Sequence, residues 1–157
     1  TYYDELKKQQ AEYATKKDEL IKKAKEISEK GEYTREDTAA MKELNVLWKE
    51  VPTCGRYRDE RLWRKFKGLM DGYFMELKRI NEEKHENWKQ RMEDAKVRKQ
   101  ELINDQESQI NRLEHLTKEL LGESAIEEVE AKIEDKKQLI DKLKEEIADI
   151  DNTLKDE

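Results

Sequence analysis

The sequence predicts an all-α fold, in which a three-helix repeat unit has a long third helix that continues into an antiparallel coiled-coil hairpin. Of the 157 residues, 46% are charged and 34% are hydrophobic, which is far more polar than an average globular domain. The hydrophobic residues recur every three or four positions, as they do in amphipathic helices. One proline and five glycines leave little room for a turn-rich β fold.

The first two expected helices are separated by Gly31. The seam of the first helix alternates by three and four, with polar interruptions at Gln10 and Lys17. Its residues are Tyr3, Leu6, Gln10, Tyr13, Lys17, Leu20, Ala24 and Ile27. Gly31 suits the position after a helix C-terminus. Asp37 follows Thr34 by three residues, a capping-box-like start for the second helix, which Pro52 ends.

The third expected helix is long and unbroken. Asp59 is its expected N-cap, and no helix breaker follows until Gly122, so the helix should end at Leu121. Its first part carries a broad apolar face, composed of Leu62, Trp63, Phe66, Leu69, Met70, Tyr73, Phe74, Leu77 and Ile80. Gly68 and Gly72 lie four apart within it, which suggests a place where the first or second helix crosses closely.

A fourth helix after Gly122 is expected to fold back on the third, because the Gly-Glu-Ser link is short. Its seam is Ile126, Val129, Ile133, Lys136, Ile140, Leu143, Ile147, Ile150 and Leu154. The matching seam on the third helix is Ile103, Gln106, Ile110, Leu113, Thr117 and Leu120. Polar residues such as Lys136 and Gln106 commonly set the register of a coiled coil. We expect the hairpin to form within one chain and the protein to be a monomer.

The chain also contains an internal repeat. Residues 73–79 (Tyr-Phe-Met-Glu-Leu-Lys-Arg) echo residues 2–8 (Tyr-Tyr-Asp-Glu-Leu-Lys-Lys) at an offset of 71 residues. This period predicts helical modules joined in series. We assign residues 1–80 to a three-helix repeat unit, with the tail of a preceding repeat at residues 1–16. Residues 81–157 form the charged long helix and a hairpin that turns near residue 122.

Aromatic, basic and proline residues follow a characteristic order over about residues 17–80. They are Leu20-Ile21, Ala24, Leu44, Trp48-Lys49, Val51-Pro52, Leu62-Trp63, Lys65-Phe66, Asp71 and Tyr73-Phe74. This order resembles the bacterial repeat of domain-of-unknown-function family 349. The turn Thr53-Cys54-Gly55 departs from the family, where a shorter and often basic turn is common. The rest of the chain is similar to the C-terminal region of clostridial-type members. The resemblance implies a bacterial cytoplasmic helical-repeat protein and brings no established reaction.

A basic segment is the candidate binding surface. Residues 49–67 hold seven basic and three acidic residues, whereas residues 120–157 hold six basic and 13 acidic ones. Clustered arginines at a helix start favour anions, although such charges usually pair with neighbouring acids. The candidate partner-binding residues are Arg56, Tyr57, Arg58, Arg61, Arg64, Lys65 and Lys67, together with Trp88 in the charged stretch.

The residues that could carry chemistry do not form a catalytic set. Glu82 and His85 have the spacing of a di-iron ligand pair, but Arg112 rather than Glu precedes His115 by three residues. Cys54 has no histidine nearby in the sequence, so we expect a plain loop thiol. A lone cysteine fits a reducing compartment, and short apolar runs predict no membrane span. We expect no enzyme activity, cofactor, metal ion or small-molecule substrate.

The expected function is therefore a non-enzymatic helical-repeat and coiled-coil scaffold, or protein-interaction module, of the bacterial cytoplasm, with an unidentified protein partner. The alternative is an RNA- or ribosome-associated factor that docks through residues 56–67. An isoelectric point near 5.3 lacks the basic character usual in nucleic-acid-binding proteins. The helical spacing of Trp48, Trp63, Phe66, Tyr73 and Phe74 predicts a packed core, not a platform for stacking bases.

Overall fold

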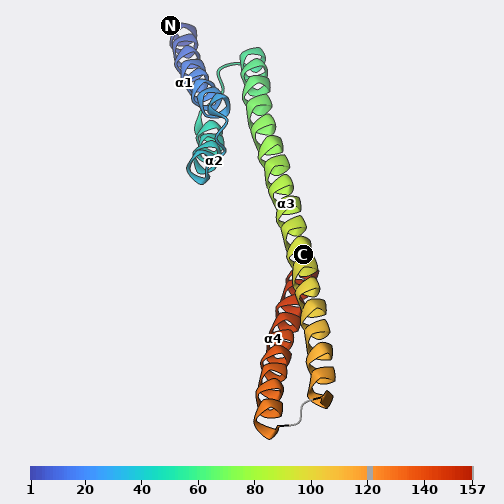
Figure 1. Ribbon diagram of the computed structural model, residues 1–157. Coiled ribbons are helices and arrows are strands. Elements are labelled where there is room, and N and C mark those ends of the chain that lie inside the picture. The colour runs from blue at the N-terminus through green and yellow to red at the C-terminus, as the bar shows by residue number, and fades with distance from the viewer. Residues whose placement is uncertain (120–121, 157) are drawn as a thin grey trace. The chain divides into compact units, whose positions relative to one another are not determined.

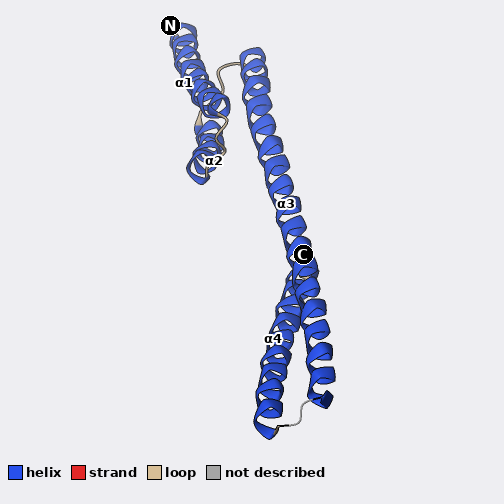
Figure 2. Cartoon of the chain, viewed as in Figure 1, coloured by secondary structure: helices blue, strands red, loops and turns tan. Residues whose placement is uncertain are grey.

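The computed structural model describes residues 1–119 and 122–156. In this part of the chain the helices are α1 (Tyr2–Lys30), α2 (Arg35–Glu50), α3 (Arg56–Glu119) and α4 (Glu123–Lys155) (Figure 1). Helices and their short connections make up the described chain, without strands (Figure 2). The predicted all-α class is confirmed. The chain divides into two compact units, Thr1–Glu82 and Glu83–Glu157.

The ends of α1 and α2 follow the predicted capping chemistry. Gly31 adopts a left-handed backbone with φ 64° just after α1, a conformation that costs glycine little because it has no Cβ. Thr34 Oγ1 accepts a hydrogen bond of 3.0 Å from Asp37 N at the start of α2. The Asp37 carboxylate accepts a 2.8 Å hydrogen bond from Lys30 Nζ, at the end of α1. The chain becomes extended at Val51.

The start of α3 corrects the prediction for Asp59. The helix begins at Arg56, and Asp59 N already donates a 2.8 Å hydrogen bond to Gly55 O. Asp59 therefore lies inside the first turn and is not the N-cap. Its carboxylate reaches back over the loop, where it accepts hydrogen bonds from Cys54 N at 3.1 Å and from Thr53 Oγ1. The predicted end of this helix, Leu121, lies outside the described residues.

The core of the first unit is aromatic, as predicted. Trp48 stacks on Phe66 with the ring centroids 4.3 Å apart, and Phe66 and Tyr73 are buried in one cluster with residues of α1 and α2. Buried aromatic rings remove a large apolar area from water, and their stacking adds a further favourable contribution. The prediction is wrong for Trp63, which is 42% exposed. Phe74 is half-buried at the edge of the cluster.

Gly68 and Gly72 do not mark a close helix crossing. Both lie on the exposed side of α3, and a Cβ atom added at either position would meet nothing within 4 Å. The side of α3 that α1 and α2 cover carries Leu62, Phe66 and Tyr73. A spacing of four shows that two glycines share a side of the helix, but it does not show which side is covered.

In the second unit, α4 packs against the later part of α3 as the predicted antiparallel hairpin (Figure 1). The buried cluster consists of predicted seam residues, namely Ile103, Ile110, Val129, Ile133, Ile140 and Leu143, with Leu113 and Ile147 packed against them. Lys99 Nζ donates a 2.6 Å hydrogen bond to Glu146 Oε2. Lys136 Nζ donates one of 2.6 Å to Gln109 Oε1. Residue numbers fall along α4 as they rise along α3, which is the antiparallel register.

The two polar seam positions behave differently. Lys136 pairs across the interface, but with Gln109 rather than with the predicted seam residue Gln106. Gln106 is half-buried. The last predicted seam residue of the third helix, Leu120, lies outside the described residues.

Candidate binding surface of the first unit

The basic residues of the predicted binding surface lie exposed on the first turns of α3. They are Arg56, Arg58, Arg61, Arg64, Lys65 and Lys67, and the exposed ring of Tyr57 lies among them. Spacings of three and four place Arg58, Arg61 and Lys65 along one side of the helix. None of these six cations forms an ion pair with a carboxylate in the part of the chain that the structure describes. No ion pair therefore holds these side chains against a neighbouring acid.

Asp59 is one of the three acidic residues among residues 49–67, and its side chain points into the first unit. Its carboxylate accepts hydrogen bonds from Lys17 Nζ at 2.9 Å and from Cys54 Sγ at 2.8 Å. Burial raises the pKa of Asp59, but the hydrogen bonds from Cys54, Thr53 and Lys17 outweigh burial and lower this pKa well below its usual range. The carboxylate is ionised and neutralised internally by Lys17. The solvent-facing side chains of residues 49–67 therefore carry more net positive charge than the count of seven basic and three acidic residues gives.

Cys54 belongs to the loop between α2 and α3, but it is 2% exposed. Burial raises the pKa of its thiol, and the hydrogen bond to Asp59 and the negative charge of Asp59 raise it further. The reactive form of cysteine is the thiolate, which this environment disfavours. The Cys54 thiol therefore has a structural role in the loop, where it donates a hydrogen bond to the Asp59 carboxylate.

A groove between α2 and α3 contains the exposed indole of Trp63. Its volume is about 450 Å³, and it is lined by Lys42, Asn45, Val46, Trp63, Lys67, Met70, Asp71 and Phe74. Trp63 lies at the border of the side of α3 that α1 and α2 cover, three residues before the buried Phe66. Sequence reasoning missed the groove because the helical spacing of Trp63 matches that of the core aromatics.

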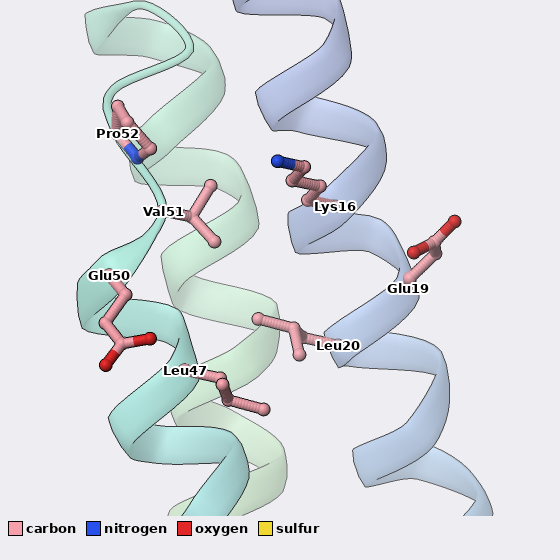
Figure 3. A pocket seen from close by; sticks show the side chains of 7 residues that line it. All are labelled: Lys16, Glu19, Leu20, Leu47, Glu50, Val51 and Pro52. Carbon is pink, nitrogen blue, oxygen red and sulfur yellow. The ribbon is translucent and has the colours of Figure 1, made fainter.

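A second hollow lies where α1 meets the end of α2 (Figure 3). Leu20 from α1 and Leu47 from α2 extend toward the gap between the two helices, and the volume is about 330 Å³. Lys16, Glu19 and Glu50 give its rim charges of both signs. None of the predicted partner-binding residues lines this hollow. Its rim carries both positive and negative charges, so it favours no class of ligand.

Trp88 belongs to the second unit and is half-buried. Its ring stacks on that of His85, one helical turn away, with the centroids 5.6 Å apart. Within residues 1–119 and 122–156, no group of three His, Cys, Asp or Glu residues could hold a metal ion. The described helices include none that is long and apolar enough to cross a lipid bilayer.

Comparison with protein-family models gave a match in the first part of the chain. Residues 1–56 match the family model described as Domain of Unknown Function (DUF349). Over these residues the chain is similar to the DUF349 family. The DUF349 match spans α1, α2 and their connections, and it ends at the first residue of α3. Comparisons with curated proteins and with solved structures gave no match.

The DUF349 match is shorter than the packed unit. It does not include Leu62-Trp63, Lys65-Phe66 or Tyr73-Phe74, which contributed to the resemblance seen in the sequence. In the structure, Phe66 and Tyr73 nevertheless belong to the same buried cluster as Leu20 and Trp48 of the matched segment. The hairpin of α1 and α2 therefore needs a third helix, from outside the matched residues, to complete its core.

Proposed function

We propose that this chain is a non-enzymatic helical-repeat and coiled-coil scaffold of the bacterial cytoplasm, and that its first unit binds an acidic amphipathic helix of a partner protein. The observation that carries the proposal is the groove in which Trp63 is exposed between α2 and α3. Tryptophan is among the residues most enriched at the energetic centres of protein interfaces. We expect a monomer, in which the first unit offers one such groove.

The lining of the groove indicates the chemistry of the partner. Val46, Trp63 and Phe74 offer apolar contacts of the kind on which an amphipathic helix lays its apolar face. Lys42 and Lys67 add positive charge at the same site, against the single carboxylate of Asp71. The unpaired Arg64 belongs to the same turns of α3. A partner helix with acidic flanks complements these charges, and charge complementarity contributes to specificity and association rate.

The titratable groups support a structural rather than a catalytic reading. General acid catalysis near neutral pH needs a carboxyl group with a raised pKa. For Asp37, Asp59, Glu76 and Glu146, hydrogen bonds to neighbouring donors outweigh burial and lower the pKa. The free and buried Cys54 fits a reducing compartment such as the cytoplasm.

Calorimetric titration with synthetic helices tests the proposal. The probe is an amphipathic peptide with leucine on one face and glutamate on its flanks, compared with a peptide in which lysine replaces glutamate. We expect the glutamate peptide to bind more tightly, and Trp63→Ala to weaken it about tenfold or more, as expected for an interface centre. Met75→Ala removes another exposed apolar side chain of α3, outside the groove, and should leave binding unchanged. Equal binding of the two peptides would contradict the proposal.

A second candidate function is RNA binding through the basic side of α3. The observation that favours it is the set of unpaired cations around the exposed ring of Tyr57, because aromatic rings and cations together bind single-stranded nucleic acid. The affinity for a single-stranded RNA oligonucleotide should then fall steeply with salt. Arg61→Glu combined with Arg64→Glu should abolish binding, whereas Trp63→Ala should not alter it. RNA affinity that survives the double substitution removes this candidate.

A further inference from the structure

One short sequence occurs twice in this chain, in two different environments. Residues 2–8 of α1 and residues 73–79 of α3 are identical at four of seven positions, which hold Tyr, Glu, Leu and Lys. Tyr73 is 1% exposed, whereas Tyr2 and Tyr3 are each 73% exposed. The first copy of the motif therefore exposes the tyrosine whose counterpart, Tyr73, is buried in the second copy.

The environment of Tyr73 shows how the motif is covered. Its ring stacks on Tyr33 with the centroids 4.8 Å apart. Its hydroxyl lies 2.9 Å from Thr38 Oγ1, within hydrogen-bond distance. Phe74 and Leu77 pack against the same buried cluster. The connection between α1 and α2 and the first turns of α2 thus provide a socket for this motif.

The equivalent residues of α1 have the same chemistry without such a cover. Tyr2 corresponds to Tyr73, Tyr3 to Phe74, and Leu6 to Leu77. Tyr2 and Tyr3 contact each other edge to face, with centroids 5.7 Å apart, and Leu6 is half-buried. Two adjacent exposed aromatic rings leave apolar area open for a partner to cover.

We propose that Tyr2, Tyr3 and Leu6 are a docking surface for a second copy of the α1–α2 hairpin, which covers them as this chain's own hairpin covers Tyr73, Phe74 and Leu77. The occupant is a copy of the hairpin whose third helix has no Tyr73 in the socket, because in this chain Tyr73 fills the socket formed by Tyr33 and Thr38. In this arrangement α1 serves two hairpins. Its first turns complete the core of one copy, and Ala14, Leu20 and Ala24 belong to the core of its own unit.

A tandem fusion tests this proposal on the full chain. Residues 1–72 are joined directly to residues 2–157, so that the junction Gly72–Tyr2 reproduces the natural junction Gly72–Tyr73. The control fusion has two alanines at the junction, which turn Tyr2 by about 200° around the helix axis while keeping every other residue. Cys54 is kept in the added copy and replaced by serine in the original one, and its reaction with a thiol reagent reports how often the added hairpin opens.

We expect Cys54 of the added copy to react about tenfold or more slowly in the in-phase fusion than in the control, because local opening exposes the thiol. Tyr2→Ala in the in-phase fusion should restore fast reaction, and Tyr2→Phe, which keeps the ring, should have a smaller effect. Tyr73→Ala in the unfused chain is the reference and should speed the reaction of its Cys54. Equal rates in the two fusions, no effect of Tyr2→Ala, or no effect of Tyr73→Ala would each overturn the proposal.

Discussion

Lys17 Nζ lies 2.9 Å from Asp59 Oδ1 and 5.2 Å from the ring centroid of Trp48, and the lysine is 6% exposed. This single cation on α1 therefore contacts both α2 and α3. The contact explains the polar interruption that Lys17 makes in the apolar seam of α1. A buried charge is tolerated when an opposite charge and hydrogen bonds accompany it, and Asp59 provides both.

Removing Asp59 should be more damaging than removing the whole ion pair. We expect Asp59→Ala to lower the free energy of unfolding of the first unit by about 3 kcal/mol, because it leaves Lys17 buried without its counter-charge. Lys17→Met combined with Asp59→Ala should recover part of this loss. Urea unfolding measures the effect, and a double variant less stable than Asp59→Ala alone would contradict this account of the pair.

Acid should destabilise the first unit through Asp59. The pKa of this carboxyl lies below its ordinary value of 3.8, since the hydrogen bonds outweigh burial. Its contribution to stability is therefore complete above the pKa of the unfolded chain and is lost as the pH falls toward the lower pKa of the folded state. We expect little change from this group between pH 7 and about pH 5 and a decline below about pH 4. Asp59→Asn should flatten that decline in unfolding measurements made across the acid range.

Alanine at Gly68 or Gly72 should stabilise α3. Each glycine lies within the helix, and an added Cβ meets no atom within 4 Å. Replacing glycine by alanine in a helix interior typically adds about 0.5–1 kcal/mol. Gly31→Ala is the contrasting control, because its φ of 64° is strained for alanine. A loss of thermal stability in Gly68→Ala would indicate that something covers this side of the helix.

The thiol of Cys54 should react slowly with thiol reagents in the folded protein. Its burial and raised pKa reduce both access and the thiolate fraction at neutral pH. Ser108→Cys in a Cys54→Ser background places a thiol at an exposed position of α3 and should react at the rate of a free cysteine. Urea should bring the two rates together. Equal rates without urea would show that the loop is open.

Neighbouring residues of α4 should respond very differently to truncation. Ile140 is buried in the hairpin cluster and Leu139 is exposed. We expect Ile140→Ala to destabilise the second unit by about 2–4 kcal/mol, as cavity-forming substitutions do, and Leu139→Ala to have an effect below about 0.5 kcal/mol. Hydrogen exchange of the α4 amides measures both. Similar effects of the two substitutions would mean that the helices pair in another register.

The parts of this structure that follow a strict local period could be predicted from the sequence. The hairpin cluster consists of residues from the two predicted heptad seams, because a two-helix interface covers a narrow stripe that spacing alone defines. The helix ends at Gly31 and Thr34 were predicted for a similar reason, since capping depends on residues a few positions apart.

The features around the candidate site could not be predicted in this way. Trp63 and Phe66 both fit the helical spacing of the apolar face of α3, yet Trp63 lines an open groove and Phe66 is completely covered. Gly68 and Gly72 could have lain on either side of α3. The role of Asp59 depends on Lys17, which is 42 residues away in the chain. Each outcome depends on where α1 and α2 lie against α3, and no short pattern records that placement.

The amino-acid sequence by itself determined that this chain forms amphipathic helices, where two of them begin or end, and which residues form the apolar interface of the hairpin. The tertiary structure alone decided which side of α3 is buried, which cations remain unpaired and which aromatic ring is exposed. The physical reason is that helix formation and capping depend on neighbours in the chain, whereas burial depends on contacts between residues that only the packed helices bring together.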